Sequence, residues 1–222
     1  MSRGIKVLLV DDHPVVRTGY RHLLQMDPEL EVVAEASDSA TAYDAFRALA
    51  PDVVVMDISL PGVSGIEVMK RMRAARPQAR VLIFSMHDEA IFVTRALQAG
   101  ASGFLSKSSA PERLLEAVHA VARDGRYVGD ESSRRGGAPQ SPAAALLNDL
   151  SHREAEAFRL WAQGLGSDAI GSRLGVSGKT VANYLSLVRQ KLGAQNDVQL
   201  MRLAERIWSA DPSQSPAQAP RS

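Results

Sequence analysis

The first 125 residues alternate between short apolar runs and longer segments with helical spacing, and this alternation constrains the fold more than any other feature. The run at 53–56 is continuous and rich in valine, which is typical of a strand buried on both faces. Strands that alternate with helices predict an α/β doubly wound fold, in which a five-stranded parallel sheet has helices on both faces. The strands are predicted at residues 6–10, 31–36, 53–56, 81–85 and 103–106, and the helices at 14–26, 38–49, 65–75, 88–99 and 111–124.

The rest of the chain is organised differently. Residues 131–142 are rich in Ser, Gly, Pro and Arg, as linkers are. From Leu150 onward only helical periodicity is present, with a capping-box spacing at Ser151 and Glu154, so the sequence predicts a small all-α domain of four helices. Residues 211–222 are of low complexity and are predicted to be disordered. We therefore expect an α/β domain at 4–129, a linker at 130–147, a helical domain at 148–209 and a tail at 210–222.

Composition excludes several classes of protein. The chain has no cysteine, which excludes disulfide scaffolds and thiolate metal sites. No apolar run approaches the roughly 20 residues of a membrane helix, and residues 1–4 lead directly into the first strand, so we expect a soluble cytoplasmic protein without a membrane partner. Residues 1–130 carry 15 Lys/Arg against 17 Asp/Glu, and residues 131–222 carry 11 against 8. This asymmetry favours a sensing part followed by a nucleic-acid-binding part.

Acidic side chains follow two of the predicted strands. Asp11 and Asp12 come after the first strand and Asp57 after the third, and in a doubly wound sheet these carboxyl ends meet at one edge. Three carboxylates there repel one another and need a hard divalent cation, for which Mg²⁺ is suited. Ser85 and Lys107 end or follow the fourth and fifth strands at the same edge. This set predicts phosphoryl transfer onto Asp57, with the metal and the lysine neutralising phosphoryl oxygens.

Four motifs carry a resemblance to a known domain: DDHP at 11–14, MDISLPGVSG at 56–65, SMHDE at 85–89 and GASGFLSK at 100–107. In this order they resemble the receiver domain of two-component response regulators. The resemblance implies that a histidine kinase phosphorylates Asp57, with Ser85 as switch hydroxyl, Lys107 as phosphate counter-ion and Phe104 as switch aromatic. It also implies an Mg²⁺ site formed by Asp12, Asp57, Asp11 through water, and the Ser59 carbonyl. His13 is a further candidate ligand, but no other histidine stands at metal-ligand spacing, so packing at the start of a helix is the favoured role.

The helical part resembles the LuxR-type helix-turn-helix over about residues 148–206, through the Ser151/Glu154 spacing, the LGVS turn at 174–177, KTV at 179–181 and KLG at 191–193. A receiver, a linker and this module together resemble the NarL/FixJ family of response-regulator transcription factors. The resemblance implies binding to double-stranded DNA and a homodimer formed on phosphorylation or on DNA.

The third helix of this part has an apolar stripe of Val181, Leu185, Val188 and Leu192 and an opposite polar face that can enter a major groove. The candidate DNA-binding residues are Lys179, Thr180, Ala182, Asn183, Tyr184, Ser186, Arg189 and Lys191. Ala182, Tyr184 and Leu187 stand where many family members have Lys, His and Asn, so the family's base-reading pattern does not carry over directly. On the fourth helix, Val198, Met201 and Trp208 are the candidate dimer residues, against the alternative that all of them pack on their own domain.

The sequence therefore predicts a two-domain response regulator that is not an enzyme beyond self-phosphorylation from a donor and slow autodephosphorylation. One alternative is a phosphorylation-independent DNA-binding regulator that uses its receiver as an interaction surface. A less favoured one is an Asp-nucleophile phosphatase, for which Ser59 stands where an Asp is typical and no segment is large enough for a cap domain.

Overall fold

The computed structural model describes residues 4–61, 63–86, 90–127, 147 and 150–208. The chain divides into two compact units, Met1–Ala138 and Pro139–Ser222. The expected tail at 210–222 and, except for Leu147, the expected linker at 130–147 lie outside the described residues. Among the helices that are described, none has the length and apolar character needed to cross a bilayer.

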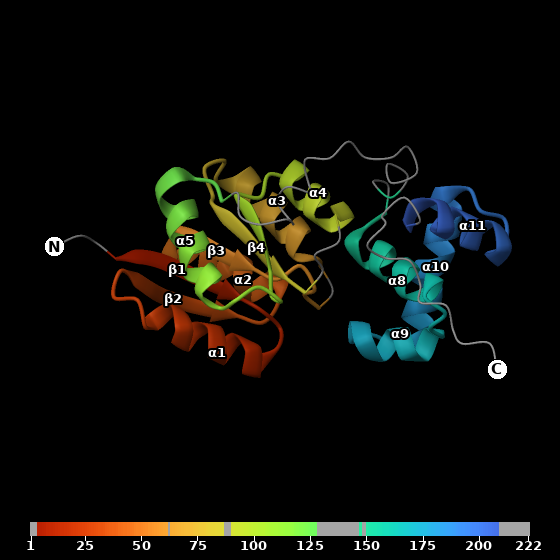
Figure 1. The fold of residues 1–222 in the computed structure, drawn as a ribbon, viewed down its shortest axis with the longest axis horizontal. Helices are drawn as coiled ribbons and strands as arrows, with labels where there is room; N and C mark the ends of the chain where they lie inside the picture. Colours follow the sequence, from red (N-terminus) through yellow and green to blue (C-terminus); the bar gives the residue numbers. More distant parts are fainter. Residues whose placement is uncertain (1–3, 62, 87–89, 128–146, 148–149, 209–222) are drawn as a thin grey trace. The chain divides into compact units, whose positions relative to one another are not determined.

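The first unit is built on a five-stranded, fully parallel sheet with the strand order β2-β1-β3-β4-β5 (Figure 1). Its strands are β1 (Ile5–Val10), β2 (Leu30–Ala36), β3 (Val53–Met56), β4 (Val81–Ser85) and β5 (Gly103–Ser106). The chain moves from β1 to β2 on one side and then crosses back to β3, so the order reverses at β1 and β3. This is the doubly wound topology that the sequence predicts, and the carboxyl ends of β1 and β3 flank the switch point.

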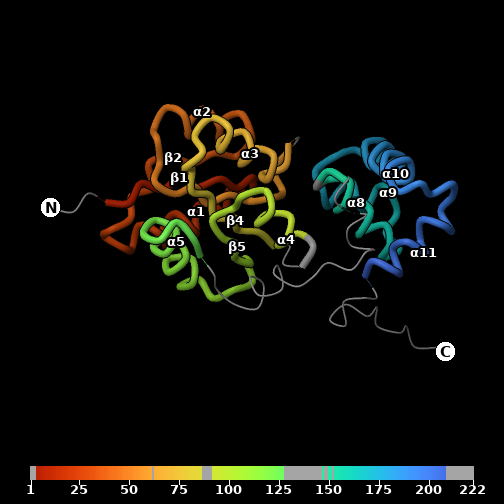
Figure 2. The backbone as a smooth tube through the Cα atoms, turned by 90° about the horizontal axis from the view of Figure 1, so that it is seen from above, coloured from red at the N-terminus to blue at the C-terminus, as the bar shows by residue number. Residues whose placement is uncertain are grey.

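Helices cover both faces of the sheet. They are α1 (Pro14–Gln25), α2 (Ser39–Leu49), α3 (Gly65–Ala75), α4 (Ala90–Gln98) and α5 (Glu112–Asp124). Side chains of α2, α3 and α4 share one apolar cluster with alternate residues of the strands, and those of α1 and α5 share the other. Figure 2 shows α2 and α3 side by side. The sequence placed the fourth helix at 88–99; the structure describes α4 from Ala90 to Gln98, with residues 87–89 outside its description.

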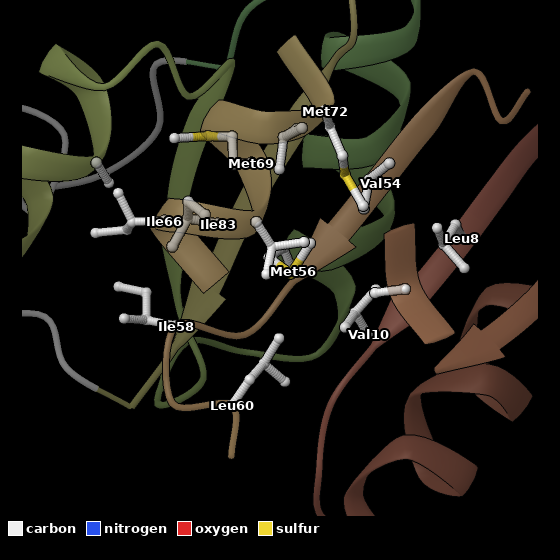
Figure 3. Close-up of a cluster of buried hydrophobic side chains, with 14 of the residues drawn as sticks. Leu8, Val10, Val54, Met56, Ile58, Leu60, Ile66, Met69, Met72 and Ile83 are labelled. Carbon is white, nitrogen blue, oxygen red and sulfur yellow. The ribbon is translucent and has the colours of Figure 1, made fainter. Parts of the chain in front are cut away.

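The apolar cluster between α3 and the sheet extends to the edge of the sheet where Asp57 lies. Figure 3 shows Met69 and Met72 of α3 against strand side chains that include Met56 and Val54. Ile58 and Leu60, which follow Asp57, are fully buried in the same cluster. The loop that carries Asp57 is therefore held in place by the packing of its apolar side chains, which removes the conformational freedom that a surface loop would have.

The second unit contains α8 (His152–Ala162), α9 (Ser167–Leu174), α10 (Gly178–Leu192) and α11 (Asp197–Trp208). The predicted capping box is present at the start of α8, where Ser151 and Glu154 bond each other's backbone N–H groups. Ser177 caps α10 by accepting from Thr180 N at 3.1 Å. The apolar stripe of α10 packs against α8 and α9, with Val181 and Leu185 buried beside Ile170 and Leu174. Both parts of the predicted fold class are thus confirmed.

Candidate functional site

The site lies where β1 and β3 end. Asp57 directly follows β3, and its backbone N–H donates to the carbonyl of Val10 at 2.9 Å, which brings it beside the end of β1. On the other side, Gly65 N donates to the carbonyl of Ile58 at 2.9 Å, which fixes the start of α3 against the same loop. These backbone bonds place the Asp57 carboxylate next to Asp11 and Asp12.

Lys107 joins two of the carboxylates. Its Nζ donates to Asp11 Oδ2 at 2.5 Å and to Asp57 Oδ2 at 2.6 Å, and all three side chains are about 5% exposed or less. Burial lowers the pKa of Lys107, but the charges of Asp57 and Asp11 outweigh burial, so its pKa lies above its usual value. The ammonium is therefore held charged between the two acids.

Asp12 is bound less completely than Asp11. Asp11 Oδ1 accepts from His13 N at 2.8 Å, whereas Asp12 Oδ1 is buried without a hydrogen-bond partner. His13 Nδ1 approaches that oxygen to 2.8 Å, without hydrogen-bond geometry. His13 is at the start of α1, as expected, but its side chain is 66% exposed, so the expectation that it packs there is wrong. Desolvation is the largest cause of a raised pKa at Asp12; the charge of His13 opposes it, and the neighbouring carboxylates Asp57 and Asp11 add to it.

The donor set suits a hard divalent cation. One carboxylate oxygen from each of Asp11, Asp12 and Asp57 can be chosen so that all lie within 4.8 Å of one another, together with a nitrogen of His13. A single lysine cannot balance three carboxylates, and the buried Asp12 oxygen has no hydrogen-bond partner. Because Mg²⁺ binds oxygen ligands and retains several waters, this donor set fits it.

The remaining predicted receiver residues lie close by in the fold. Ser85 ends β4 fully buried, and its carbonyl accepts from Lys107 N at 2.8 Å. Ser59 N donates to Asp57 Oδ1 at 3.1 Å, and the Ser59 hydroxyl is buried without a hydrogen-bond partner. Phe104 on β5 is fully buried in the cluster that includes Val93 of α4.

Sequence reasoning missed two residues that shape the site. Gly65 lies so close to the backbone oxygen of Asp57 that an added Cβ would overlap it. Its signal was the glycine at a helix start just after the acidic loop, where only a bare backbone can approach. Arg17 on α1 donates from Nη1 to the backbone oxygen of Asp11 at 2.6 Å. No spacing rule points to this contact, since a long side chain can reach many partners.

In the second unit, the polar face of α10 carries exposed side chains. Lys179, Ala182, Asn183 and Ser186 are all exposed on it. Thr180 is partly buried, and its hydroxyl bonds the Ser177 hydroxyl at 2.9 Å, whereas Tyr184 packs against the apolar cluster of the unit. Asn183 is therefore an exposed amide on this face, with the small side chains of Ala182 and Ser186 beside it.

The two cations near the end of α10 are held by acids. Arg189 Nη1 donates to Asp197 at 2.6 Å, and Lys191 Nζ donates to both oxygens of Glu154 at 2.7 and 3.0 Å. Burial raises the pKa of Glu154, but its bonds with Lys191 and Ser151 outweigh this and hold it below the usual value. Lys191 thus connects the end of α10 to the start of α8.

The three candidate dimer residues differ in their surroundings. Val198 is 63% exposed, and Met201 is half-buried. Trp208 packs on Phe158 of its own unit, with ring centroids 5.0 Å apart. Val198 is accordingly the apolar side chain of α11 most open to a partner.

Comparisons with known proteins support the two parts separately. Residues 7–119 match the family described as "Response regulator receiver domain", and residues 148–204 match "Bacterial regulatory proteins, luxR family". The chain is 40% identical over 202 residues to the transcriptional activator protein ExaE of Pseudomonas putida, covering 89% of this chain and 94% of that one. It is 37% identical over 204 residues to the transcriptional regulatory protein UhpA of Escherichia coli, covering 92% and 100%.

Solved structures show the same two similarities. The receiver domain of the putative response regulator NarL from Mycobacterium tuberculosis is 38% identical, with a TM-score of 0.54, over 56% of this chain and all of that one. RcsB from Salmonella enterica serovar Typhimurium, bound to a promoter in the presence of the phosphomimetic BeF3-, is 26% identical with a TM-score of 0.60. That match covers 92% of this chain and all of RcsB.

Proposed function

This chain belongs to the NarL/FixJ family of response regulators, in which a receiver domain precedes a LuxR-type DNA-binding domain, and from that premise we propose that Asp57 is its phosphoacceptor. Like its relatives, the chain is a DNA-binding transcription regulator. The proposed phosphodonor is the phosphohistidine of a sensor histidine kinase. The observation that carries the assignment is the bond of Lys107 Nζ to both Asp57 and Asp11.

The phosphoryl transfer follows from these contacts. A carboxylate oxygen of Asp57 forms the new O–P bond, the P–N bond of the phosphohistidine breaks, and the leaving imidazole keeps the electron pair and takes up a proton. Lys107 already lies beside the attacking carboxylate and stabilises the negative charge of the phosphoryl oxygens. The buried Ser85 at the end of β4 is proposed to bond the phosphoryl group, and Phe104 to repack with it.

Asp11, Asp12, Asp57 and the Ser59 carbonyl are proposed to hold Mg²⁺, with Asp11 acting through water. Three carboxylates and an incoming phosphoryl group carry more negative charge than one lysine can balance. When bound, the ion would supply the additional positive charge. The buried oxygen of Asp12 without a hydrogen-bond partner supports this assignment.

The output of this proposal is a change in DNA binding. Phosphorylation shifts a two-state receiver, which controls pairing of two copies and exposure of α10. Lys179 and Asn183 are the proposed central DNA contacts, with Ala182 and Ser186 beside them; Thr180, Tyr184, Arg189 and Lys191 orient the helix or contact the backbone. The protein is also proposed to form a homodimer through Val198, Met201 and Trp208. Its proposed location is the cytoplasm, where DNA is accessible. Beyond phosphorylating itself and slowly losing the phosphate, the protein is proposed to have no enzymatic activity.

The test treats the full chain with acetyl phosphate, with and without Mg²⁺, and reads intact mass and DNA affinity on the same samples. One acid-labile phosphate should appear in the presence of Mg²⁺, together with tighter DNA binding. Asp57→Asn should abolish the mass increase, whereas Asp44→Asn, at an exposed position of α2, should leave it unchanged. Asp12→Ala should abolish most of the reaction because the metal site loses its least satisfied ligand.

The same samples distinguish the alternatives. Phosphate uptake without any change in DNA affinity would favour the phosphorylation-independent regulator. Steady release of phosphate from an added phosphoester, with multiple turnovers, would favour the phosphatase. Phosphate on Asp57→Asn at the wild-type level would make the assignment of the acceptor wrong.

A further inference from the structure

Arg17 connects three segments around the acidic loop. It lies on α1, its Nη1 donates to the backbone oxygen of Asp11 at 2.6 Å, and its Nε donates to Glu35 Oε2 on β2 at 3.2 Å. The Arg17 side chain is 18% exposed; its bond to Asp11 is partly buried, whereas its bond to Glu35 is exposed. Glu35 is itself held by Arg21 at 3.4 Å. The guanidinium therefore has a defined orientation before any ligand arrives.

The bond from Arg17 fixes the backbone that leads to Asp12. Asp11 N donates to the carbonyl of Ala36 at 3.1 Å, so the strand side of this residue is held by β2. Its carbonyl, which has left the sheet, is held by Arg17 instead. Because the peptide group is planar, holding the Asp11 oxygen also fixes the positions of Asp12 N and Cα.

The two acids of the loop differ in what holds their side chains. The Asp11 carboxylate is bonded to Lys107 and to His13 N, and it would keep its place without Arg17. The buried oxygen of Asp12 has no hydrogen-bond partner, and its one close contact is the exposed ring of His13, 2.8 Å away, so the orientation of the backbone is the main constraint on where it lies. A change in the Asp11–Asp12 peptide would move Asp12 before it moved Asp11.

We propose that Arg17, oriented by Glu35, is a positioning residue that presents Asp12 as a ligand for the divalent cation. The inference rests on the proposed function, since it concerns the same metal site. Arginine is suited to the task because its rigid fork donates to two acceptors in fixed directions, which a lysine ammonium on a flexible stem cannot do. Groups that orient a metal ligand typically change metal affinity by about 10- to 100-fold when removed.

The experiment measures Mn²⁺ binding to the full chain directly, from the electron paramagnetic resonance signal of the free ion, with Mg²⁺ as competitor. Arg17→Ala should weaken Mn²⁺ binding by about 10-fold. Arg17→Lys should bind with intermediate affinity, because it keeps one contact of two. Arg21→Ala is the matched control: it removes a cation from the same Glu35 without touching Asp11, and should bind Mn²⁺ as the wild type does.

Thermal unfolding followed by circular dichroism separates positioning from a merely structural role. A purely structural arginine would lower the melting temperature and leave the Mn²⁺ affinity of the folded protein unchanged, which would overturn the inference. If Arg17→Ala does not fold, Glu35→Gln and Arg17→Lys decide, and wild-type affinity in both would equally overturn it. Absence of Mn²⁺ binding by the wild type would instead remove the proposed metal site itself, and the inference with it.

Discussion

Lys107 Nζ lies 2.6 Å from Asp57 Oδ2, although 50 positions separate the two residues in the chain. The contact exists because β3 and β5 both end at the same edge of a parallel sheet, with β4 between them. Lys107 is also bonded to Asp11, so the ammonium balances part of the charge of two buried acids. In the proposed function, the reactivity of Asp57 therefore depends on a residue that directly follows the last strand.

Replacing Lys107 should therefore impair phosphorylation more than folding. In Lys107→Ala the incoming phosphoryl oxygens lose a fixed positive charge, and the initial rate of phosphate uptake from acetyl phosphate should fall by about 10²–10³-fold. Lys70→Ala is the control, because Lys70 pairs with Glu67 on the exposed face of α3. A rate within twofold of the wild type would show that the lysine has no part in the transfer.

Two glycines should respond in opposite ways to the same substitution. In Gly65→Ala the new methyl group overlaps the Asp57 backbone, so α3 must shift, at a cost of about 1–3 kcal/mol in unfolding free energy and with slower phosphate uptake. In Gly19→Ala, inside α1, no atom apart from the chain neighbours and the nearby backbone of the helix itself lies within 4 Å of the new Cβ, and stability should rise by about 0.5–1 kcal/mol. Urea unfolding measured by circular dichroism checks both. Equal changes in unfolding free energy for Gly65→Ala and Gly19→Ala would contradict the close approach of Gly65 to the Asp57 backbone.

The ion pair of Glu154 and Lys191 should make the second unit sensitive to acid. The pKa of Glu154 is lowered in the folded protein, so its stabilisation is complete above the unfolded value, near 4.5, and is lost as the pH falls through the folded value. Both tryptophans lie in this unit, so fluorescence-detected urea unfolding reports on it alone.

Glu154→Gln can keep the capping bond but loses the charge. This substitution should lower the unfolding free energy of the second unit by about 1 kcal/mol at pH 7, and by less at pH 3.5. Glu205→Gln, at an exposed position of α11, is the control and should change neither value. If the difference in unfolding free energy between wild type and Glu154→Gln became larger at low pH, the expected pH dependence would be wrong.

On DNA, Lys179 and Asn183 should have separable roles. Lys179→Ala should weaken specific and non-specific binding alike and reduce the slope of log affinity against log salt by about one, as the loss of one phosphate contact requires. Asn183→Ala should cost about 1–3 kcal/mol on the preferred site and relax preference at one base pair per half-site, because an amide can bond adenine N6 and N7. Binding-site selection with each variant measures this. An unchanged motif for Asn183→Ala would mean that specificity comes from DNA shape.

The exposed side chain of Val198 should matter for pairing and not for folding. Val198→Glu should leave the melting temperature unchanged and shift the stoichiometry on a palindromic site from two copies to one, measured by sedimentation. Met26→Glu introduces the same charge at an apolar position that is 80% exposed in the first unit, and should leave two copies per site. Two copies with Val198→Glu would place the dimer contact elsewhere.

Much of this molecule was determined by local sequence. The predicted strands agree with β3, β4 and β5 at both ends, because continuous apolar runs bounded by turns leave little choice of boundary. The helix start at Ser151 was predicted because a side-chain oxygen satisfies free backbone N–H groups two or three residues away. The carboxylates at the strand ends were predicted as a group from topology alone, since parallel strands bring their carboxyl ends to one edge.

Tertiary structure alone decided how individual side chains are used. His13 was expected to pack but is exposed, while Arg17, which no motif singled out, holds the backbone of Asp11. Likewise, Lys191 was proposed for DNA binding from its place on a basic helix, and the fold gives it Glu154 as a partner. Backbone elements follow from patterns of neighbouring residues, which a sequence displays directly. The partner of a long charged side chain depends on which distant atoms folding brings within its reach, and only the assembled structure contains that information.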